Sequence, residues 1–501
     1  MNYSALQNGS DIRGIAMENE TGAVNLTVNE VRHLAAAFAD WLKGKTGKSS
    51  LKVAVGRDSR LTGEDFVRAS IEGLNAKGVK TYDCGLASTP AMFMTTVTKG
   101  YEFDGSIMIT ASHLPWYRNG MKFFTPEGGL EGRNIKSLTA LAEELDLTDS
   151  FDSGCEKLEF MDVYAEHLRD TIKNGVKADD FDHPLKGLHV IVDAGNGCGG
   201  FYVSKVLEPL GANTEGSQFL DPDGHFPNHI PNPENKEAAE SIAKATLDAK
   251  ADLGIIFDTD VDRAGAILPD GRSLTRNALI AVLSRIALAE HPGTTIVTDS
   301  VTSSGLAEFI KAHGGVHRRF KRGYRNVIDE AIRLNNEGHD SQLAIETSGH
   351  GAFKENYFLD DGAYLMVKLL IELGKGHKLE EMIADLKEPA ESVELRFPVL
   401  ADDVSLLSDS ILNTIKASVE FVDGWSLAPD NFEGVRVNVA DHKGNGWFLI
   451  RKSLHEPIMP LNIESDDEDG CPIIAKSLYD IIKREDMLNL QSIIDYIGNS
   501  L

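Results

Sequence analysis

Three aspartates at alternate positions form the motif in this sequence that most clearly suggests chemistry. They follow a largely apolar stretch at 252–257, and are Asp258, Asp260 and Asp262. Alternate side chains can converge where a strand opens into a loop, and three unpaired carboxylates placed there repel one another strongly. A hard divalent cation removes this repulsion, and Mg²⁺ favours a few carboxylates together with a phosphate oxygen. Arg263 follows at once, and a guanidinium can bind a phosphate through two parallel hydrogen bonds.

Two other interpretations of this acidic loop are open. It could be a solvated turn, or it could be a loop that binds Ca²⁺. The twelve-residue EF-hand pattern fails here, because the position of its bidentate glutamate falls at Pro269. The spacing of the three aspartates favours metal binding over a solvated turn.

A serine and a histidine stand side by side where a second apolar stretch ends. The stretch at 105–109 stops in small polar residues, which predicts that Ser112 and His113 lie on an exposed turn. Lys122 follows on a short returning strand, and a hydroxyl beside a basic group can act as a nucleophile. No G-x-S-x-G motif surrounds Ser112, so a hydrolase triad is not supported. A lone Ser-His pair is usually an ordinary turn, and by itself it is weak evidence for catalysis.

The elements that would position these residues follow a repeated order of strand, polar turn and amphipathic helix. This order occurs three times along the chain. The strand and turn at 53–58 lead into a helix at 64–71, those at 190–200 into a helix at 202–210, and those at 295–300 into a helix at 305–313. Strands that alternate with helices predict α/β layers, here as three tandem α/β domains. Beyond residue 390, strands separated by turns and accompanied by two helical segments predict a smaller α+β domain.

The length of the chain supports this division. A sequence of 501 residues is too long for a single hydrophobic core, so several domains are expected. We predict four domains, over residues 1–160, 161–274, 275–389 and 390–501.

Charge and composition exclude several classes of partner. A formal net charge of −27 argues against nucleic acid or an anionic membrane surface as a partner. The four cysteines include no C-x-x-C pair, which predicts neither a zinc site nor a disulfide framework and suits a reducing cytoplasm. The first residues lack the pattern of a signal peptide, and no apolar run is long enough to cross a bilayer. We expect a soluble, cytoplasmic protein.

Four stretches taken together resemble the α-D-phosphohexomutase family. They are similar to its phosphoserine, metal, sugar and phosphate loops, and lie at 110–115, 258–263, 346–350 and 451–457. They occur in the order of the family, one in each predicted domain. The sequence Glu-x-Ser-Gly-His of the third stretch is closest to phosphomannomutase/phosphoglucomutase enzymes. The resemblance implies three mixed-sheet α/β domains and a smaller C-terminal domain arranged around a central cleft.

The resemblance also implies an activity and the residues that perform it. The expected enzyme is an intramolecular phosphotransferase that interconverts the 1- and 6-phosphates of glucose, mannose or both, through a phosphoserine at Ser112 and a hexose 1,6-bisphosphate. The implied catalytic residues are Ser112, Lys122, His350, Arg13 and Arg263. A single Mg²⁺ ion in each active site would be held by Ser112, Asp258, Asp260 and Asp262. The implied substrate-binding residues are His113, Lys321, Glu346, Ser348, Arg451, Ser453 and His455.

The identity of the sugar is left open by the sequence. Glu346 and Ser348 would contact the 3- and 4-hydroxyls, which glucose and mannose present identically. Leu454 and His455 depart from the Gly/Asn and Thr that the family commonly has in its phosphate loop. A phosphoglucosamine or phosphopentose mutase of the same family is therefore an alternative, and a metal-dependent sugar phosphatase or a silent phosphosugar-binding protein is a more distant one. We expect a monomer or homodimer that is activated by hexose 1,6-bisphosphate.

Overall fold

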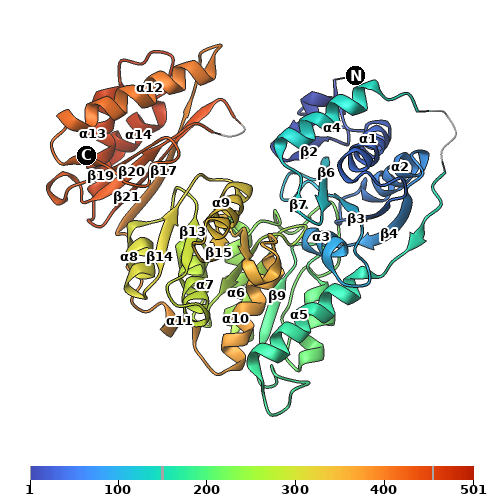
Figure 1. Ribbon diagram of the computed structural model, residues 1–501. Helices are drawn as coiled ribbons and strands as arrows, with labels where there is room; N and C mark the ends of the chain where they lie inside the picture. The colour runs from blue at the N-terminus through green and yellow to red at the C-terminus, as the bar shows by residue number, and fades with distance from the viewer. Residues whose placement is uncertain (1, 148–151, 454–455, 501) are drawn as a thin grey trace. The chain divides into compact units, whose positions relative to one another are not determined.

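The computed structural model forms two compact units. The residues that it describes are 2–147, 152–453 and 456–500. The first unit comprises the chain up to residue 275 together with 348–352 and 359–382, and the second comprises 276–347, 353–358 and the chain from 383. Each unit is built on two β-sheets (Figure 1). None of the described helices has the length and apolar character that would let it span a membrane.

The first sheet is of mixed direction and has the strand order β1-β2-β6-β5-β3-β4-β8, with β7 beside β6. Its strands are β1 Gln7–Asn8, β2 Asp11–Ile15, β3 Lys52–Arg57, β4 Lys80–Leu86, β5 Gly105–Ile109, β6 Arg118–Thr125, β7 Gly128–Gly129 and β8 Glu156–Lys157. The strands β3, β4, β5 and β8 run parallel, and β6 and β2 continue the sheet in antiparallel order. The carboxyl ends of β3 and β5 therefore lie at one edge, where loops can form a site.

Three helices cover one face of this sheet, and their apolar residues share one core with it (Figure 1). They are α1 Val28–Thr46, α2 Gly63–Ala76 and α4 Gly132–Glu144, whereas α3 Thr89–Val97 contacts β5 and β6. Helix α1 begins with a capping box formed by Thr27 and Glu30 and ends at Gly47, whose φ of 69° is left-handed. Both features satisfy the backbone groups that a helix leaves free at its ends.

The second sheet has the strand order β12-β11-β10-β9. Its strands are β9 Val190–Asp193, β10 Leu253–Phe257, β11 Ala264–Ile267 and β12 Ser273–Leu274. The helices of this part are α5 Phe160–Val176, α6 Lys236–Ala249, α10 Gly362–Gly374 and α11 Leu379–Met382. Every residue of the apolar strand β10 is buried between β9, which is parallel to it, and β11, which is antiparallel. The acidic loop at 258–262 starts where this buried strand ends.

The second unit contains a parallel sheet and an antiparallel one. The parallel strands are β13 Thr295–Thr298, β14 Val316–Arg319 and β15 Ser341–Ile345, with α7 Arg276–Glu290, α8 Ser304–Ala312 and α9 Tyr324–Asn336. The antiparallel sheet has the order β17-β21-β20-β19-β18, with bounds Glu391–Pro398, Ile458–Ser465, Gly446–Ile450, Val435–Val439 and Trp425–Leu427. Helices α12 Val404–Ser418, α13 Gly470–Ile482 and α14 Gln491–Ser500 accompany this sheet (Figure 1). The short strand β16, Gly351–Phe353, lies where the chain passes between the units.

The predicted class, three mixed α/β domains and a smaller C-terminal α+β domain, is confirmed by these sheets. The helix expected over 202–210 instead consists of a π-helical segment, Tyr202–Leu207, and a 3₁₀ turn, Glu208–Leu210. Pro209 cannot donate a backbone hydrogen bond, so an α-helix cannot continue regularly through it. Strand β21 was not predicted, and the four domain boundaries stay a prediction.

The core of the first sheet gives a stability prediction. Phe38 is fully buried on α1, with its ring centroid 4.9 Å from that of Phe123. We expect Phe38→Ala to lower the free energy of unfolding by about 3–5 kcal/mol, measured by urea denaturation, because truncation leaves a cavity in a packed core. The matched control is Phe421→Ala, since the side chain of Phe421 is 86 % exposed and should cost little. Equal losses in the two variants would contradict this assignment of the core.

Candidate active site

The loop after β10 places three carboxylates in the interior of the first unit. Asp258, Asp260 and Asp262 are each at most 1 % exposed. Val261, between two of them, has a φ of 64°, which is a strained value for a β-branched residue. Around this turn, one oxygen of each carboxylate lies within 4.8 Å of those of the other two. The loop therefore concentrates negative charge at one buried point.

The unsatisfied oxygens of this loop fit a divalent cation. Among the described residues, Asp260 Oδ1 and Asp262 Oδ1 are buried and have no hydrogen-bond partner. Burial and the negative charge of Asp262 raise the pKa of Asp258 well above its usual value, because a further buried charge is unfavourable here. A hard cation would supply both the missing contacts and the missing charge. The donor set consists only of carboxylate oxygens, which suits such an ion.

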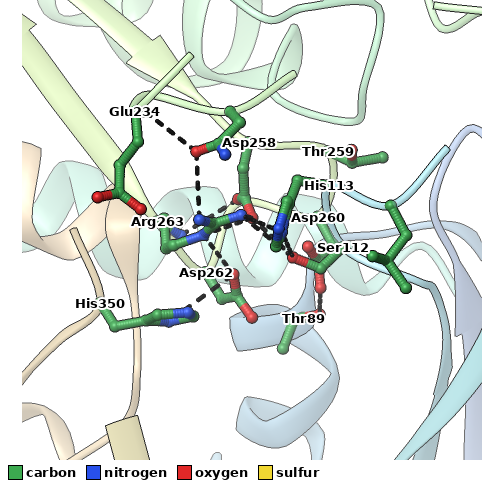
Figure 2. Close-up of polar contacts among 12 residues, drawn as sticks. Thr89, Ser112, His113, Glu234, Asp258, Thr259, Asp260, Asp262, Arg263 and His350 are labelled. Carbon is green, nitrogen blue, oxygen red and sulfur yellow. Dashed lines mark hydrogen bonds and ion pairs between the residues drawn. The ribbon is translucent and has the colours of Figure 1, made fainter. Parts of the chain in front are cut away.

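Ser112 lies directly beside this cluster, on the loop that follows β5. Its hydroxyl is 3.2 Å from Asp258 Oδ2, 3.3 Å from Arg263 Nη2 and 3.2 Å from His113 Nδ1 (Figure 2). The residue is only 5 % exposed, so the prediction of an exposed turn is wrong for Ser112, and its φ is 51°. Its backbone N–H donates to Thr110 Oγ1 at 2.9 Å. The serine is therefore held in a strained turn with its hydroxyl among charged groups.

Two buried cations offset the charge of the aspartates. The Lys122 ammonium, on β6, donates to Asp262 Oδ2 and lies 3.5 Å from Asp260 Oδ2. Arg263 Nε donates to Asp258 Oδ2 at 3.1 Å. Burial alone would raise the pKa of Asp262, but the positive charges of Lys122, His350 and Arg263 hold it far below its usual value. Asp262 is therefore ionised, and Arg263 also reaches the Ser112 hydroxyl.

The two histidines of the site differ in protonation. His350 Nδ1 contacts Asp360 Oδ2 at 2.6 Å and lies 4.0 Å from Asp262 Oδ1. Burial would lower its pKa, but the carboxylates of Asp360 and Asp262 raise it to about 9. Burial and the neighbouring Arg263 lower the pKa of His113 to about 2. Near neutral pH, His350 is an imidazolium and a proton donor, whereas His113 accepts a hydrogen bond from Arg263 Nη2 at 2.7 Å.

Arg13 and Ser348 complete the predicted residues of the first unit. Arg13, on β2, forms a partly buried ion pair with Asp11 at 2.8 Å. Burial would lower the pKa of Arg13, but the charges of Asp11, Asp260 and Asp262 raise it. The side chain thus adds positive potential to the aspartate loop. Ser348 is 9 % exposed.

The other predicted substrate-binding residues belong to the second unit. Glu346 Oε1 accepts a hydrogen bond from Gly323 N at 2.5 Å. Arg451 is buried, its Nη1 lies 3.8 Å from Glu433 Oε1, and its Nε has no hydrogen-bond partner among the described residues. Ser453 Oγ accepts from Glu456 N at 3.3 Å. Lys321 Nζ lies 5.8 Å from the centroid of the Phe320 ring. His455, and with it Leu454, lies outside the described residues.

Three residues of this site were missed by the sequence interpretation. Asp360 contacts His350, Thr89 N donates to the backbone oxygen of Asp260 at 2.8 Å, and Asn232 Oδ1 accepts from Arg263 Nη1 at 3.2 Å. No motif marks Thr89 or Asn232. Asp360 and Asp361 form an acidic pair before α10, which could have been noted as a partner for His350.

Comparison with known proteins covers nearly the whole chain. Models of the phosphoglucomutase/phosphomannomutase α/β/α domains I, II and III match residues 5–148, 162–271 and 275–389. The chain is similar to a phosphomannomutase/phosphoglucomutase of Pseudomonas putida, with 30% identity over 472 residues and 91% of each chain covered. It is 29% identical to a phosphoglucomutase of Neisseria gonorrhoeae over 481 residues, which cover 94% of this chain and 95% of that protein. The fold is similar to the crystal structure of a phosphoglucomutase/phosphomannomutase family protein from Burkholderia thailandensis, with a TM-score of 0.78, 26% identity and 98% of each chain covered.

The aspartate loop gives a direct binding prediction. We expect Asp260→Asn to weaken divalent cation binding by at least about tenfold, because a buried carboxylate oxygen without a hydrogen-bond partner is replaced by a neutral amide. Titration calorimetry with Mn²⁺ measures this change. Asp270→Asn is the matched control, since Asp270 is exposed and pairs with Arg272. Equal affinity in Asp260→Asn and the unmodified protein would remove the loop as a cation site.

Proposed function

The chain is a member of the phosphoglucomutase/phosphomannomutase family, and on that premise we propose that Ser112 carries the phosphoryl group of a hexose phosphate mutase. Glucose and mannose phosphates are the expected substrates. The observation that carries the proposal is the position of the Ser112 hydroxyl, 3.2 Å from Asp258 and 3.3 Å from Arg263, in a buried cluster of opposite charges. Such preorganised charges stabilise the negative charge that spreads over the phosphoryl oxygens during transfer.

The reaction consists of two phosphoryl transfers. In the first, the sugar hydroxyl loses its proton and its oxygen bonds to phosphorus, the bond to Ser112 Oγ breaks, Ser112 Oγ takes up a proton, and a hexose 1,6-bisphosphate forms. After the bisphosphate turns around, Ser112 Oγ takes the other phosphoryl group and the product leaves. Arg263 and Lys122 stabilise the charge that spreads over the phosphoryl oxygens. Hexose 1,6-bisphosphate added in small amounts would restore the phosphoserine, which explains its expected role as an activator.

Mg²⁺ is the cation that we propose for the aspartate loop. The ligands would be Asp258, Asp260 and Asp262 together with a phosphate oxygen on Ser112. When bound, the ion would neutralise charge on the phosphoryl group during transfer. The hard-cation fit of the buried carboxylate oxygens supports this choice, because Mg²⁺ commonly combines a few carboxylates with substrate phosphate.

Proton movement at the sugar hydroxyl falls to the side chains around Asp262. Lys122 Nζ donates to Asp262 Oδ2, and His350 Nδ1 lies 4.0 Å from Asp262 Oδ1. Both can exchange a proton with a hydroxyl that enters beside Ser112. Asp360 keeps His350 oriented through Nδ1, and Arg13 contributes positive charge near the same point.

The remaining predicted residues would bind the part of the substrate that does not react. We assign Glu346 and Ser348 to the sugar hydroxyls, and a positively charged clamp to the distal phosphate. The proposed clamp residues are Lys321, Arg451, Ser453 and His455, with His113 beside the reacting phosphoryl group. The buried guanidinium of Arg451, with Nε unpartnered among the described residues, supports the clamp. Each of the four proposed domains, 1–160, 161–274, 275–389 and 390–501, would contribute one loop in a cytoplasmic monomer or homodimer.

The covalent step can be tested at Ser112. We expect intact-mass analysis of the protein, after incubation with glucose 1,6-bisphosphate, to show one added phosphate that maps to Ser112. Ser112→Ala should lack that phosphate and lose glucose 1-phosphate mutase activity by at least about 10⁴-fold, since the phosphoryl carrier is gone. Ser106→Ala is the control, because Ser106 is buried on β5 with its hydroxyl bonded to Met92 O at 2.7 Å. Full turnover by Ser112→Ala would refute the mechanism, and steady phosphate release without isomerisation would indicate a sugar phosphatase instead.

The phosphate clamp gives a second functional prediction. Arg451→Lys should raise KM for glucose 1-phosphate by about tenfold with a smaller effect on kcat, because a lysine cannot reproduce the planar, two-pronged contact of a guanidinium with phosphate. Arg396→Lys is the matched control, since the side chain of Arg396 is 63 % exposed on β17. Steady-state kinetics separates the two constants. An unchanged KM in Arg451→Lys would exclude Arg451 from the clamp.

A further inference from the structure

A single buried arginine, Arg60, binds several carbonyl groups of the loop that carries Ser112. This serine loop comprises residues 110–117, between β5 and β6. Arg60 Nη2 donates to the carbonyl oxygens of Ser112 and Leu114, the latter at 2.6 Å. Arg60 Nη1 donates to the carbonyl oxygens of Pro115 at 2.9 Å and Arg118 at 2.8 Å. Three carbonyl groups of the loop and that of Arg118, the first residue of β6, thus converge on one guanidinium.

Arg60 supplies donors to buried carbonyl groups of the serine loop, of which that of Pro115 also accepts from Arg118 N at 3.0 Å. A buried carbonyl without a donor costs about 1–3 kcal/mol. Ser112 also has the left-handed φ of 51°, which the surrounding structure has to maintain. A guanidinium has five donors in a rigid plane, whereas an ammonium has three on a flexible stem. Arginine is therefore the one side chain that can bind all four carbonyls in a fixed geometry.

Arg60 is itself held from two sides. Its Nε lies 3.4 Å from Asp58 Oδ2, and neither side chain is exposed. The ring of Phe226 covers the guanidinium, with its centroid 5.3 Å from Cζ. Beside it, Gly224 approaches so closely that an added Cβ would lie 2.9 Å from Arg60 Cα. The chain that connects β9 to β10 thus closes over the arginine, and Arg60 contacts both this connection and the serine loop.

We propose that Arg60 is a positioning residue for phosphoryl transfer, which fixes the backbone of the serine loop so that the Ser112 hydroxyl faces the aspartate loop. In the loop it binds carbonyl groups, one of them that of Ser112 itself. This inference rests on the proposed role of Ser112. Its consequence is selective: a misplacement of about 1 Å at a reacting atom can reduce the rate by about 10²-fold without weakening the binding of distant groups.

The same loop would govern the loss of phosphate to water. In that side reaction a water oxygen bonds to phosphorus, the bond to Ser112 Oγ breaks, and inorganic phosphate and a serine hydroxyl result. A more mobile loop would slow transfer to the sugar hydroxyl, which requires a fixed geometry. It would not slow hydrolysis, because water can approach the phosphoserine from many directions. The ratio of phosphate release to mutase turnover should therefore rise when Arg60 is replaced.

The test is Arg60→Lys, with Arg68→Lys as matched control because Arg68 is exposed on α2 and pairs with the exposed Asp65. We expect kcat for glucose 1-phosphate to fall by about 10²-fold, KM to change by less than about threefold, and phosphate release per turnover to increase. Arg68→Lys should match the unmodified protein in all three. A thermal melt of each variant reports the folded fraction.

Three results would overturn the inference. They are an unchanged kcat in Arg60→Lys, an unchanged ratio of phosphate release to turnover, and a loss of activity that only follows the folded fraction. If Arg60→Lys does not fold, Phe226→Leu replaces it, since that change loosens the guanidinium and keeps its charge. Phe226→Leu should lower kcat by about three- to tenfold with an unchanged KM, and equal kcat would count against the role. Failure of the proposed mutase function can be distinguished from failure of this inference, because the unmodified protein would then carry no phosphate on Ser112.

Discussion

The arrangement of charges in the first unit depends on the repulsion among three buried carboxylates. Asp258, Asp260 and Asp262 lie within 4.8 Å of one another with almost no access to solvent, so positive charge has to be supplied from elsewhere in the fold. Lys122 comes from β6, Arg263 from the end of the same loop, and His350 from a segment almost ninety residues later. Within the part of the chain that the structure describes, two buried oxygens of these carboxylates still have no hydrogen-bond partner. The fold therefore holds a preformed arrangement of charges at a site where a cation and a phosphoryl group can complete the balance.

The two reactive loops occupy the position that α/β topology favours. The serine loop follows β5 and the aspartate loop follows β10, and each strand runs parallel to a neighbour. Loops at the carboxyl ends of such strands are free to carry function while the strands stay buried. Thr89 joins the two sheets by binding Asp260 through both its backbone N–H and its hydroxyl. The distances at Ser112 are thus set by rigid elements on both sides.

The sequence predicts the features that depend on local pattern. Strands followed by polar turns and helices indicate the α/β class, which the sheets confirm, and the ordered loops indicate the family, which the comparisons confirm. Strand β21 was not recognised, because it contains Pro460, which cannot donate a hydrogen bond to a neighbouring strand. Arg60 and Thr89 could not be identified, since each acts through a partner that lies near it only in the folded chain, whereas Asp360 stands in an acidic pair that could have been noted. The roles assigned to the site residues stay predictions.

Glu433 bears on how long a phosphosugar can remain bound. This carboxylate lies 3.8 Å from Arg451 and accepts hydrogen bonds from Ser300 Oγ and Arg322 N, at 2.5 and 3.1 Å. If Arg451 binds the distal phosphate, as proposed, the incoming dianion has to share the guanidinium with an anion that is already there. The residence time of the phosphate is then shorter than it would be on an unopposed cation. Weaker binding of this phosphate benefits an enzyme whose bisphosphate must dissociate from the clamp, reorient and bind again within one turnover.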